Sequence, residues 1–291
     1  EYPALLGHES VGEVVAVGSK VKRFRVGDRV VSPSGRLEPG TPYFSYWTAM
    51  AEYGIAHDIH AMMEDGLGTP PGYDIEIPED YPVRLIPEGM SYEDAVILLT
   101  IKENYSALLN FGMKPGMDVF IFGDGPAAFG LACSARAMGV GYLGCAGHHE
   151  DRLNKMSVQA KADVAVNTHN QSLEDVIGSR KFDIVVDAVG SMSVVQSGAR
   201  LLKPGGRVCV YGVLKKSQAA LNLLDLPNNT CVQVYNRPYQ EYRTHDAVCA
   251  WVASGGLELQ WFYSHVLPID EAVTAFELVK SREAYKVILT M

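Results

Sequence analysis

The sequence predicts an α/β protein built around a parallel β-sheet that is covered by helices on both faces. From about residue 118 onward, short strands alternate with helical segments, beginning with the strand "DVFIFG" and the helix "AAFGLACSARAMG". The strands are apolar without interruption, as in "FDIVVDAVG", which is typical of strands buried on both faces. A chain of 291 residues is also long for one hydrophobic core, which favours two domains.

The composition excludes several classes of function. The chain is 47% hydrophobic and 20% charged, which is typical of a folded globular protein. Its net charge of −9, without a basic cluster, argues against nucleic acid or an anionic membrane as a partner. No apolar run is long enough to cross a bilayer, and no signal-like leader is apparent. The five cysteines form no C-x-x-C pair, which excludes a four-cysteine zinc lobe and indicates reduced thiols in a cytoplasmic protein.

The other elements are predicted from local patterns. Residues 12–31 are rich in valine and read as strands, and 41–82 as a short strand around 51–55 followed by a long irregular excursion. A helix is predicted from the N-cap candidate Ser91 to the glycine at position 112, because apolar residues recur at helical spacing between them. The C-terminal tail ends in the helix "DEAVTAFELVKS" and the strand "AYKVILTM".

A glycine turn between the first strand and helix of the alternating region predicts a dinucleotide site. Gly123 and Gly125 take the first two places of the pattern G-x-G-x-x-G, Pro126 follows them, and Ala128 takes the third place. The first glycine permits the tight turn, the second lets a diphosphate approach the backbone, and a small third residue lets helix and strand pack closely. The diphosphate would lie at the helix N-terminus, where free N–H groups favour anions.

The end of the next strand bears on the choice of coenzyme. Proteins that bind NAD carry an Asp or Glu at this strand end, which hydrogen-bonds the ribose hydroxyls. Here the strand ends in Gly147, followed by His148 and His149. Without a carboxylate to repel it, a 2′-phosphate would be tolerated, and the histidines could bind it or flank the adenine. This favours NADP(H), although Glu150 or Asp151 could still serve NAD.

Several short motifs, most of them containing glycine, occur one after another along almost the whole chain. They are Gly7-His8-Glu9, Gly12, Val17-Gly18, Gly27-Asp28-Arg29-Val30, Ala51-Glu52-Tyr53, Lys114-Pro115-Gly116, the Gly123-x-Gly125-Pro126 turn and "LLKPGGRVCVYGV". This ordered set resembles the medium-chain dehydrogenase/reductase superfamily, the zinc-dependent alcohol and polyol dehydrogenases.

The resemblance implies a Rossmann domain with a doubly wound sheet at residues 100–236. It also implies a mostly-β, GroES-like catalytic domain at residues 1–99 and 237–291. Hydride would pass between an alcohol or carbonyl substrate and a nicotinamide in a cleft between the domains. By the family pattern, the cofactor groove is lined by Val189, Gly190, Tyr211, Gly212 and Val213. A homodimer or homotetramer is implied as well.

In the zinc-using members of this superfamily, the catalytic metal takes a Cys, the His of G-H-E and an acid or second Cys. It polarises the alcohol oxygen through a vacant fourth position. His8 and Glu9 are present, and we expect the first Cys position to fall before Glu1. The third position falls at Leu98 or Leu99, neither of which can bind a metal.

Two residues shortly after these leucines leave three interpretations open. Glu103 could replace the missing ligand, giving a site of His8, Glu9 and Glu103. Lys102 could act without zinc, as an electrostatic partner or proton donor to the substrate oxygen. Alternatively, both are surface residues on the outer face of the helix.

The sequence therefore predicts an NAD(P)-dependent oxidoreductase that acts on a secondary alcohol, a polyol or a sugar-like carbonyl, with an incomplete or altered zinc site. One alternative is a zinc-free NADPH-dependent reductase of the same superfamily. Another is a dinucleotide-binding protein without turnover, which the leucines at the ligand position motivate. The sequence does not identify the substrate.

Overall fold

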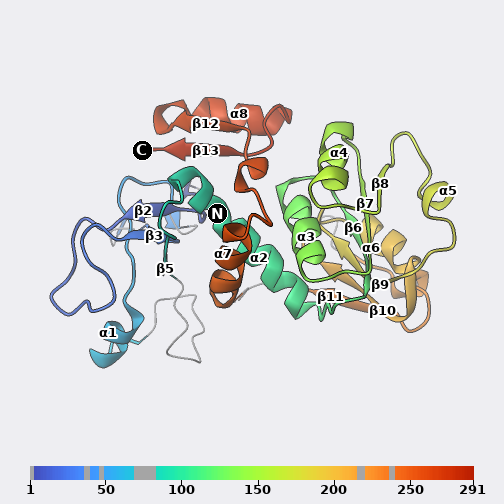
Figure 1. The fold of residues 1–291 in the computed structure, drawn as a ribbon, viewed down its shortest axis with the longest axis horizontal. Coiled ribbons are helices and arrows are strands. Elements are labelled where there is room, and N and C mark those ends of the chain that lie inside the picture. Colours follow the sequence, from blue (N-terminus) through green and yellow to red (C-terminus); the bar gives the residue numbers. More distant parts are fainter. Residues whose placement is uncertain (1–2, 36–39, 46–48, 69–82, 215–219, 236–239) are drawn as a thin grey trace. The chain divides into compact units, whose positions relative to one another are not determined.

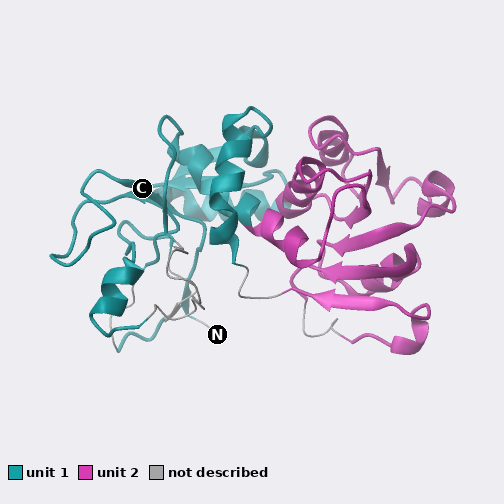
Figure 2. Ribbon diagram, turned by 60° about the horizontal axis from the view of Figure 1, so that its bottom comes forward, with its two compact units in different colours: residues 1–102, 240–291 teal, residues 103–239 magenta. Residues whose placement is uncertain are grey.

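The computed structural model describes residues 3–35, 40–45, 49–68, 83–214, 220–235 and 240–291. These residues form two compact units, of which unit 1 comprises residues 1–102 and 240–291 and unit 2 comprises residues 103–239 (Figure 2). The α/β class predicted from the sequence is confirmed, because unit 2 contains an all-parallel sheet with helical crossovers. The predicted domain boundaries after residues 99 and 236 stay predictions.

Unit 2 is built on a six-stranded parallel sheet in the order β8–β7–β6–β9–β10–β11 (Figure 1). Its strands are β6 (Asp118–Phe122), β7 (Tyr142–Gly147), β8 (Val164–Asn167), β9 (Phe182–Asp187), β10 (Leu202–Val210) and β11 (Cys231–Val234). The chain starts in the middle of the sheet at β6, proceeds outward through β7 and β8, and then returns to β9 on the other side of β6. This is the strand order 3-2-1-4-5-6 of doubly wound sheets, and the order reverses between β6 and β9.

Helices connect successive strands of this sheet. They are α3 (Pro126–Ala137), α4 (Glu150–Val158), α5 (Leu173–Ile177) and α6 (Met192–Ala199), with a short 3₁₀ turn at Leu223–Asp225. Parallel crossovers are right-handed, so those that move in opposite directions from the centre place their helices on opposite faces. Figure 1 shows α3 and α4 together on one side of the strands.

Three phenylalanines form the centre of the core in unit 2. The ring of Phe120 lies 5.0 Å from those of both Phe122 and Phe182, measured between centroids, and all three side chains are buried. Gly144 on β7 makes this packing possible, because a Cβ there would overlap the Phe120 ring. The uninterrupted apolar strands are therefore explained by burial on both faces of the sheet.

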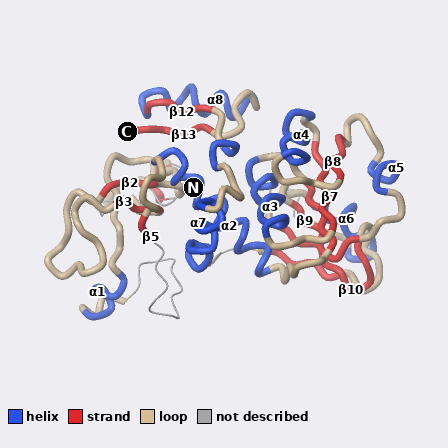
Figure 3. Tube along the Cα trace, viewed as in Figure 1, coloured by secondary structure: helices blue, strands red, loops and turns tan. Residues whose placement is uncertain are grey.

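Unit 1 is a collection of short strands and helices (Figure 3). Its strands are β1 (Ala4–Leu5) paired with β4 (Phe44–Ser45), the antiparallel set β2 (Val11–Glu13), β3 (Arg29–Val31) and β5 (Arg84–Leu85), and the parallel pair β12 (His265–Pro268) and β13 (Val287–Thr290). Its helices are α1 (Ile59–Glu64), the first part of α2 (Tyr92–Asn110), α7 (His245–Ala253) and α8 (Ala272–Ser281), with 3₁₀ turns at Glu241–Thr244, Leu259–Phe262 and Ile269–Glu271. A small core packs Val14, Phe24, Val30 and Val83 together.

The helix predicted from Ser91 to the glycine at position 112 is confirmed as α2. The Ser91 hydroxyl accepts a hydrogen bond from the Asp94 amide, as an N-cap residue does, and two acids lie in the first turn. The helix ends before Gly112, whose φ of +75° is strained for other residues. No helix of the described ranges is long and apolar enough to span a membrane.

The segment between β4 and β5 differs from the prediction. Residues 51–55 are not a strand, since only Ile55 forms an isolated bridge with Ser34. Helix α1 lies where an irregular excursion was predicted, because the Asp58 carboxylate caps it at the Ala61 amide and also accepts from the amides of Lys22 and Arg23. Residues 69–82 of the predicted excursion fall outside the described residues.

Candidate functional site

The glycine turn after β6 forms an open cradle at the N-terminus of α3. Gly123 has a φ of +123°, and a Cβ there would lie 3.3 Å from the Ala128 methyl group, so the turn needs a glycine and a small partner. Gly125 is the N-cap residue of α3 and makes no side-chain cap, which leaves the first N–H groups of the helix without one. A Cβ on Gly125 would meet nothing within 4 Å. Pro126 at the first helical position has no N–H group, so the donors beneath this open space are the amides that follow it, which suits a diphosphate.

A buried carboxylate organises the neighbouring loop at the end of β9. Asp187 is fully buried, and its two oxygens accept hydrogen bonds from the amides of Val189 (2.8 Å), Gly190 (3.0 Å) and Ser191 (3.0 Å). Burial raises the pKa of Asp187 above its usual value, although these three amides act in the opposite direction. The carboxylate thus fixes the loop that the sequence assigned to the cofactor groove.

The loop after β10 packs directly on the loop after β9. The amides of Tyr211 and Gly212 both donate to the Asp187 carbonyl oxygen, at 2.9 and 2.8 Å. A Cβ on Gly212 would overlap the backbone of Gly190, and one on Gly190 would overlap the carbonyl of Val213. Two of the predicted cofactor segments, Val189–Gly190 and Tyr211–Val213, therefore lie together in unit 2, beside the point where the strand order reverses. Ligands of doubly wound sheets bind at such points.

The third predicted cofactor segment lies at the end of β7. Here the Asp124 carboxylate, from within the glycine turn, accepts hydrogen bonds from the amides of His148 (2.7 Å) and His149 (2.8 Å) and contacts His149 Nδ1 at 2.9 Å. Gly147 makes room for it, because a Cβ at that position would lie 2.6 Å from the Asp124 Cβ. Burial alone would raise the pKa of Asp124, but these bonds hold it below its usual value.

This arrangement bears on the prediction of NADP(H), which stays a prediction. That preference rested on the absence of a carboxylate at the end of β7, and the structure places Asp124 there. The histidines expected to bind a phosphate also have other contacts. His149 faces Asp124, and the ring of His148 stacks on His169 with centroids 4.1 Å apart.

In unit 1, Glu9 is part of a charged cluster drawn from three distant segments. Lys286 Nζ lies 2.5 Å from one carboxylate oxygen of Glu9, and the Thr100 hydroxyl donates to the other. Lys286 also donates to Thr100 Oγ1 at 2.8 Å, which closes the triangle. Burial acts to raise the pKa of Glu9, but Lys286 and Thr100 more than offset it, so that the pKa lies below its usual value. Glu9 is therefore a carboxylate at neutral pH.

The residues proposed as metal ligands do not form a cluster in the described part of the chain. No three His, Cys, Asp or Glu side chains lie close enough there to hold a metal ion. His8 is exposed, both oxygens of Glu9 are hydrogen-bonded, and Leu99 is buried. Glu103 belongs to unit 2, whereas His8 and Glu9 belong to unit 1. The assignment of the three residues as zinc ligands stays a prediction.

Lys102 is not a surface residue, which corrects one of the three interpretations. Its side chain is 1% exposed, and Glu103 beside it is half-buried. The Lys102 carbonyl oxygen accepts a hydrogen bond from Thr244 at 3.2 Å, and His245 follows directly. A buried lysine is costly in a protein interior and is often functional. The other two interpretations, Lys102 as an electrostatic group or proton donor and Glu103 as a ligand, stay predictions.

The neighbourhood of Lys102 predicts a pH-dependent stability. Burial lowers the pKa of His245 to about 3, and the positive charges of Lys102 and Arg84 add to this effect. Because the unfolded chain binds the proton more tightly, the neutral histidine stabilises the fold fully above pH ~6.5 and progressively less as the pH falls toward 3. Denaturant unfolding should show that the contribution of His245 to the free energy of unfolding falls by about 2 kcal/mol between pH 7 and pH 5.

The matched variants are His245→Gln and, as a control, His265→Gln on β12. We expect a flatter dependence of the unfolding free energy on pH for His245→Gln only. Parallel curves for His245→Gln and the unsubstituted protein would contradict the assignment of a buried neutral histidine.

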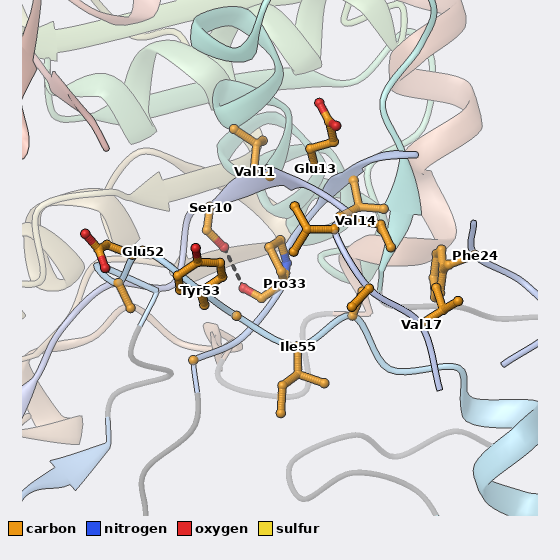
Figure 4. Close-up of a pocket in the computed structure, with 18 of the residues that line it drawn as sticks. Ser10, Val11, Glu13, Val14, Val17, Phe24, Pro33, Glu52, Tyr53 and Ile55 are labelled. Carbon is orange, nitrogen blue, oxygen red and sulfur yellow. Dashed lines mark hydrogen bonds between the residues drawn. The ribbon is translucent and has the colours of Figure 1, made fainter. Parts of the chain in front are cut away.

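Unit 1 also contains a pocket of about 430 Å³ (Figure 4). Its labelled lining includes Val14, Val17 and Ile55, and the Ser10 hydroxyl at its edge donates to the Pro33 carbonyl oxygen at 2.6 Å. None of the predicted catalytic residues lines it. We therefore assign this pocket no part in the transfer of hydride or of a proton.

Two models of known protein families match this chain. The model of the zinc-binding dehydrogenases matches residues 130–250, and that of the alcohol dehydrogenase GroES-like domain matches residues 1–63. Together they span more than half of the chain, one in each part of the fold that the sequence predicted. The chain belongs to the medium-chain dehydrogenase/reductase superfamily, and it is an oxidoreductase. The GroES-like and Rossmann-like folds predicted from the sequence are thereby confirmed.

Individual relatives agree with this assignment. The chain is 25% identical to a sorbitol dehydrogenase from Bacillus subtilis, over 95% of this chain and 77% of the relative. It is 27% identical to an L-threonine 3-dehydrogenase from Yersinia pestis, over 99% and 83%. Among solved structures, an alcohol dehydrogenase from Thermus sp. ATN1 matches with a TM-score of 0.73 and 24% identity, over 99% of this chain and 84% of that one. An Escherichia coli alcohol dehydrogenase complexed with NADH matches with a TM-score of 0.74 and 19% identity, over 100% and 85%.

Four residues of the site were missed by sequence reasoning: Asp124, Asp187, Thr100 and Lys286. Asp187 ends the strand "FDIVVD", and an acid after an apolar strand was a usable signal. Asp124 occupies the first variable position of the pattern G-x-G-x-x-G, and the pattern predicts no role for the residue at that position. Thr100 and Lys286 lie 186 positions apart, and no local pattern joins them.

Proposed function

We propose that this protein is an NAD(P)-dependent oxidoreductase that transfers hydride between a nicotinamide coenzyme and a secondary alcohol, a polyol or a sugar-like carbonyl. The single observation that carries the coenzyme half of this proposal is the cradle at Gly125. Its helix N-terminus has no side-chain cap, its open space would be filled by any side chain, and it lies at the reversal point of a doubly wound sheet.

The chain's own residues would hold the coenzyme in three places. The N–H groups at the start of α3 would bind the diphosphate, and the loops of Gly190 and Gly212, which pack backbone against backbone, would form the groove wall. The exposed apolar side chains of Val189 and Val213 would contact a ring placed against these loops. When bound, the nicotinamide supplies the hydride acceptor or donor.

The substrate class rests on the relatives. The sorbitol and threonine dehydrogenases are named for a polyol and for an amino acid with a secondary alcohol, and another structural neighbour is a 2R,3R-butanediol dehydrogenase from Bacillus subtilis. All of these substrates carry a secondary hydroxyl group, whose oxidation needs a hydride acceptor and a group that takes the hydroxyl proton.

Two versions of the proton-handling group are supported by different residues. In the first, His8 contributes to a metal site that Glu9 adjoins. In the second, which the buried side chain of Lys102 and the apolar Leu98 and Leu99 favour, no zinc is needed and Lys102 stabilises the developing alkoxide electrostatically. A homodimer or homotetramer stays a prediction in either version.

Coenzyme reduction across a panel of polyols and secondary alcohols tests the proposed function. We expect formation of NADH or NADPH, followed at its absorbance maximum, with at least one member of the panel. Binding of coenzyme without turnover on the whole panel, in either direction, would contradict the proposal.

The same assay separates the two versions. The first predicts that a strong chelator and His8→Ala both abolish turnover and remove zinc measured by atomic emission. The second predicts that the chelator has no effect, whereas Lys102→Met lowers kcat at least ~100-fold, as the loss of a transition-state charge does. Lys114→Met, at an exposed lysine, is the charge-matched control.

A further inference from the structure

The carboxylate at the end of β7 comes from an unexpected part of the chain. Asp124 lies 23 positions before Gly147, inside the glycine turn, yet its side chain occupies the space that a side chain on Gly147 would need. The absence of a side chain at position 147 is therefore what allows the carboxylate of Asp124 to lie there. The strand end keeps its negative charge, but a different element supplies it.

This position has a defined role in doubly wound sheets. The adenosine ribose of a bound dinucleotide lies at the end of the strand that follows the glycine turn and its helix, which is β7 in this chain. A carboxylate there accepts hydrogen bonds from the ribose hydroxyls and repels a 2′-phosphate.

The hydrogen-bonding state of Asp124 suits this role. All three bonds reach Oδ2, and none reaches Oδ1 within the part of the chain that the structure describes. The side chain is 12% exposed, so Oδ1 has limited but real access to solvent. A ribose hydroxyl could therefore donate to Oδ1 without displacing any bond that holds the carboxylate in place.

Two backbone donors that a 2′-phosphate could use are occupied. In a phosphate site at a helix N-terminus, the backbone N–H groups supply much of the binding. Immediately before α4, the amides of His148 and of the N-cap residue His149 already donate to Asp124. A phosphate would have to displace a negatively charged carboxylate to reach them.

We infer that Asp124 is the residue that selects the coenzyme, by binding the adenosine ribose hydroxyls and excluding a 2′-phosphate, so that the protein uses NAD(H) rather than NADP(H). This inference rests on the proposed function, because it presumes that the cradle at Gly125 holds a nicotinamide dinucleotide.

Calorimetric titration with coenzymes and their adenosine halves tests the inference without depending on turnover. The probes are NADH and NADPH, together with 5′-ADP and adenosine 2′,5′-bisphosphate. The proteins are the unsubstituted chain, Asp124→Asn and the control Asp175→Asn, which removes an exposed negative charge from the first turn of α5.

For the unsubstituted protein we expect NADH to bind at least ~10-fold more tightly than NADPH, since a buried charge-assisted hydrogen bond is gained and a like charge avoided. Asp124→Asn is isosteric, and its amide group can donate to a phosphate. It should lower the ratio of NADH to NADPH affinity by about 10- to 100-fold, with the same trend for the two adenosine halves. Asp175→Asn should change the ratio by less than about twofold, because exposed charges are screened.

Two results would overturn this inference and leave the proposed function standing. One is equal or tighter binding of NADPH by the unsubstituted protein. The other is a ratio that Asp124→Asn leaves unchanged. Since each ratio is measured within one protein, a partial loss of stability in the variant does not obscure it. Binding of neither coenzyme would overturn the proposed function and this inference with it.

Discussion

Replacing Gly125 with valine should abolish coenzyme binding while leaving the fold intact. The residue has φ −79°, ψ 177°, an extended conformation that valine adopts readily, and a Cβ there meets no atom within 4 Å. The new side chain would therefore occupy only the space in which we place the diphosphate. We expect the dissociation constant for NADH to rise at least ~100-fold, because several charge-assisted hydrogen bonds to the backbone are lost. The free energy of unfolding should change by less than about 0.5 kcal/mol.

Gly18→Ala provides a control for the addition of a side chain at an uncrowded glycine. A Cβ at Gly18 in unit 1 would make only an ordinary contact, 3.7 Å from Val21. That variant should bind NADH as the unsubstituted protein does. If Gly125→Val binds NADH with unchanged affinity, the cradle is not the diphosphate site.

Asp187→Ala should have the largest effect on stability. The substitution leaves the amides of Val189, Gly190 and Ser191 without their acceptor. A buried amide without a partner costs ~1–3 kcal/mol, so we expect the free energy of unfolding of unit 2 to fall by about 3 kcal/mol or more. Urea denaturation followed by a probe in unit 2 measures this loss. Coenzyme affinity should fall as well, since the loop lines the groove.

Asp183→Ala on the same strand is the matched control. Asp183 also accepts a backbone amide, that of Asp118 at 2.8 Å, and it pairs with Lys203, but it is partly exposed to solvent. Its replacement should cost no more than about 1 kcal/mol, because water can satisfy the groups left behind. Equal losses for the two variants would show that the buried loop of Asp187 is not specially dependent on its carboxylate.

The parts of the fold that were predictable depend on local chemistry. The strands of unit 2 are buried on both faces, which requires uninterrupted apolar residues. The turn between β6 and α3 requires a glycine at position 123, where φ is positive and a Cβ would crowd Ala128. Helix α2 begins at a serine cap and ends at a glycine with positive φ. Such requirements act within a few residues, and so they are visible in a single sequence.

The parts that were missed depend on contacts between distant segments. The sequence shows no carboxylate at the end of β7, and the prediction of NADP(H) depended on this. In the folded chain Asp124, which precedes α3 and β7 in the sequence, lies at that strand end. Lys102 follows apolar residues in α2, and only the surrounding packing distinguishes a buried lysine from an exposed one. Helix α1 depends on Asp58, whose other partners are amides 36 and 35 positions away.

A crystal structure of the complex with NADH tests the central claim most directly. The account predicts the diphosphate over Gly125, within hydrogen-bonding distance of the amides at the start of α3, and the adenosine ribose beside Asp124. NADH bound elsewhere on the chain, with the turn at residues 123–128 free of it, would contradict the account.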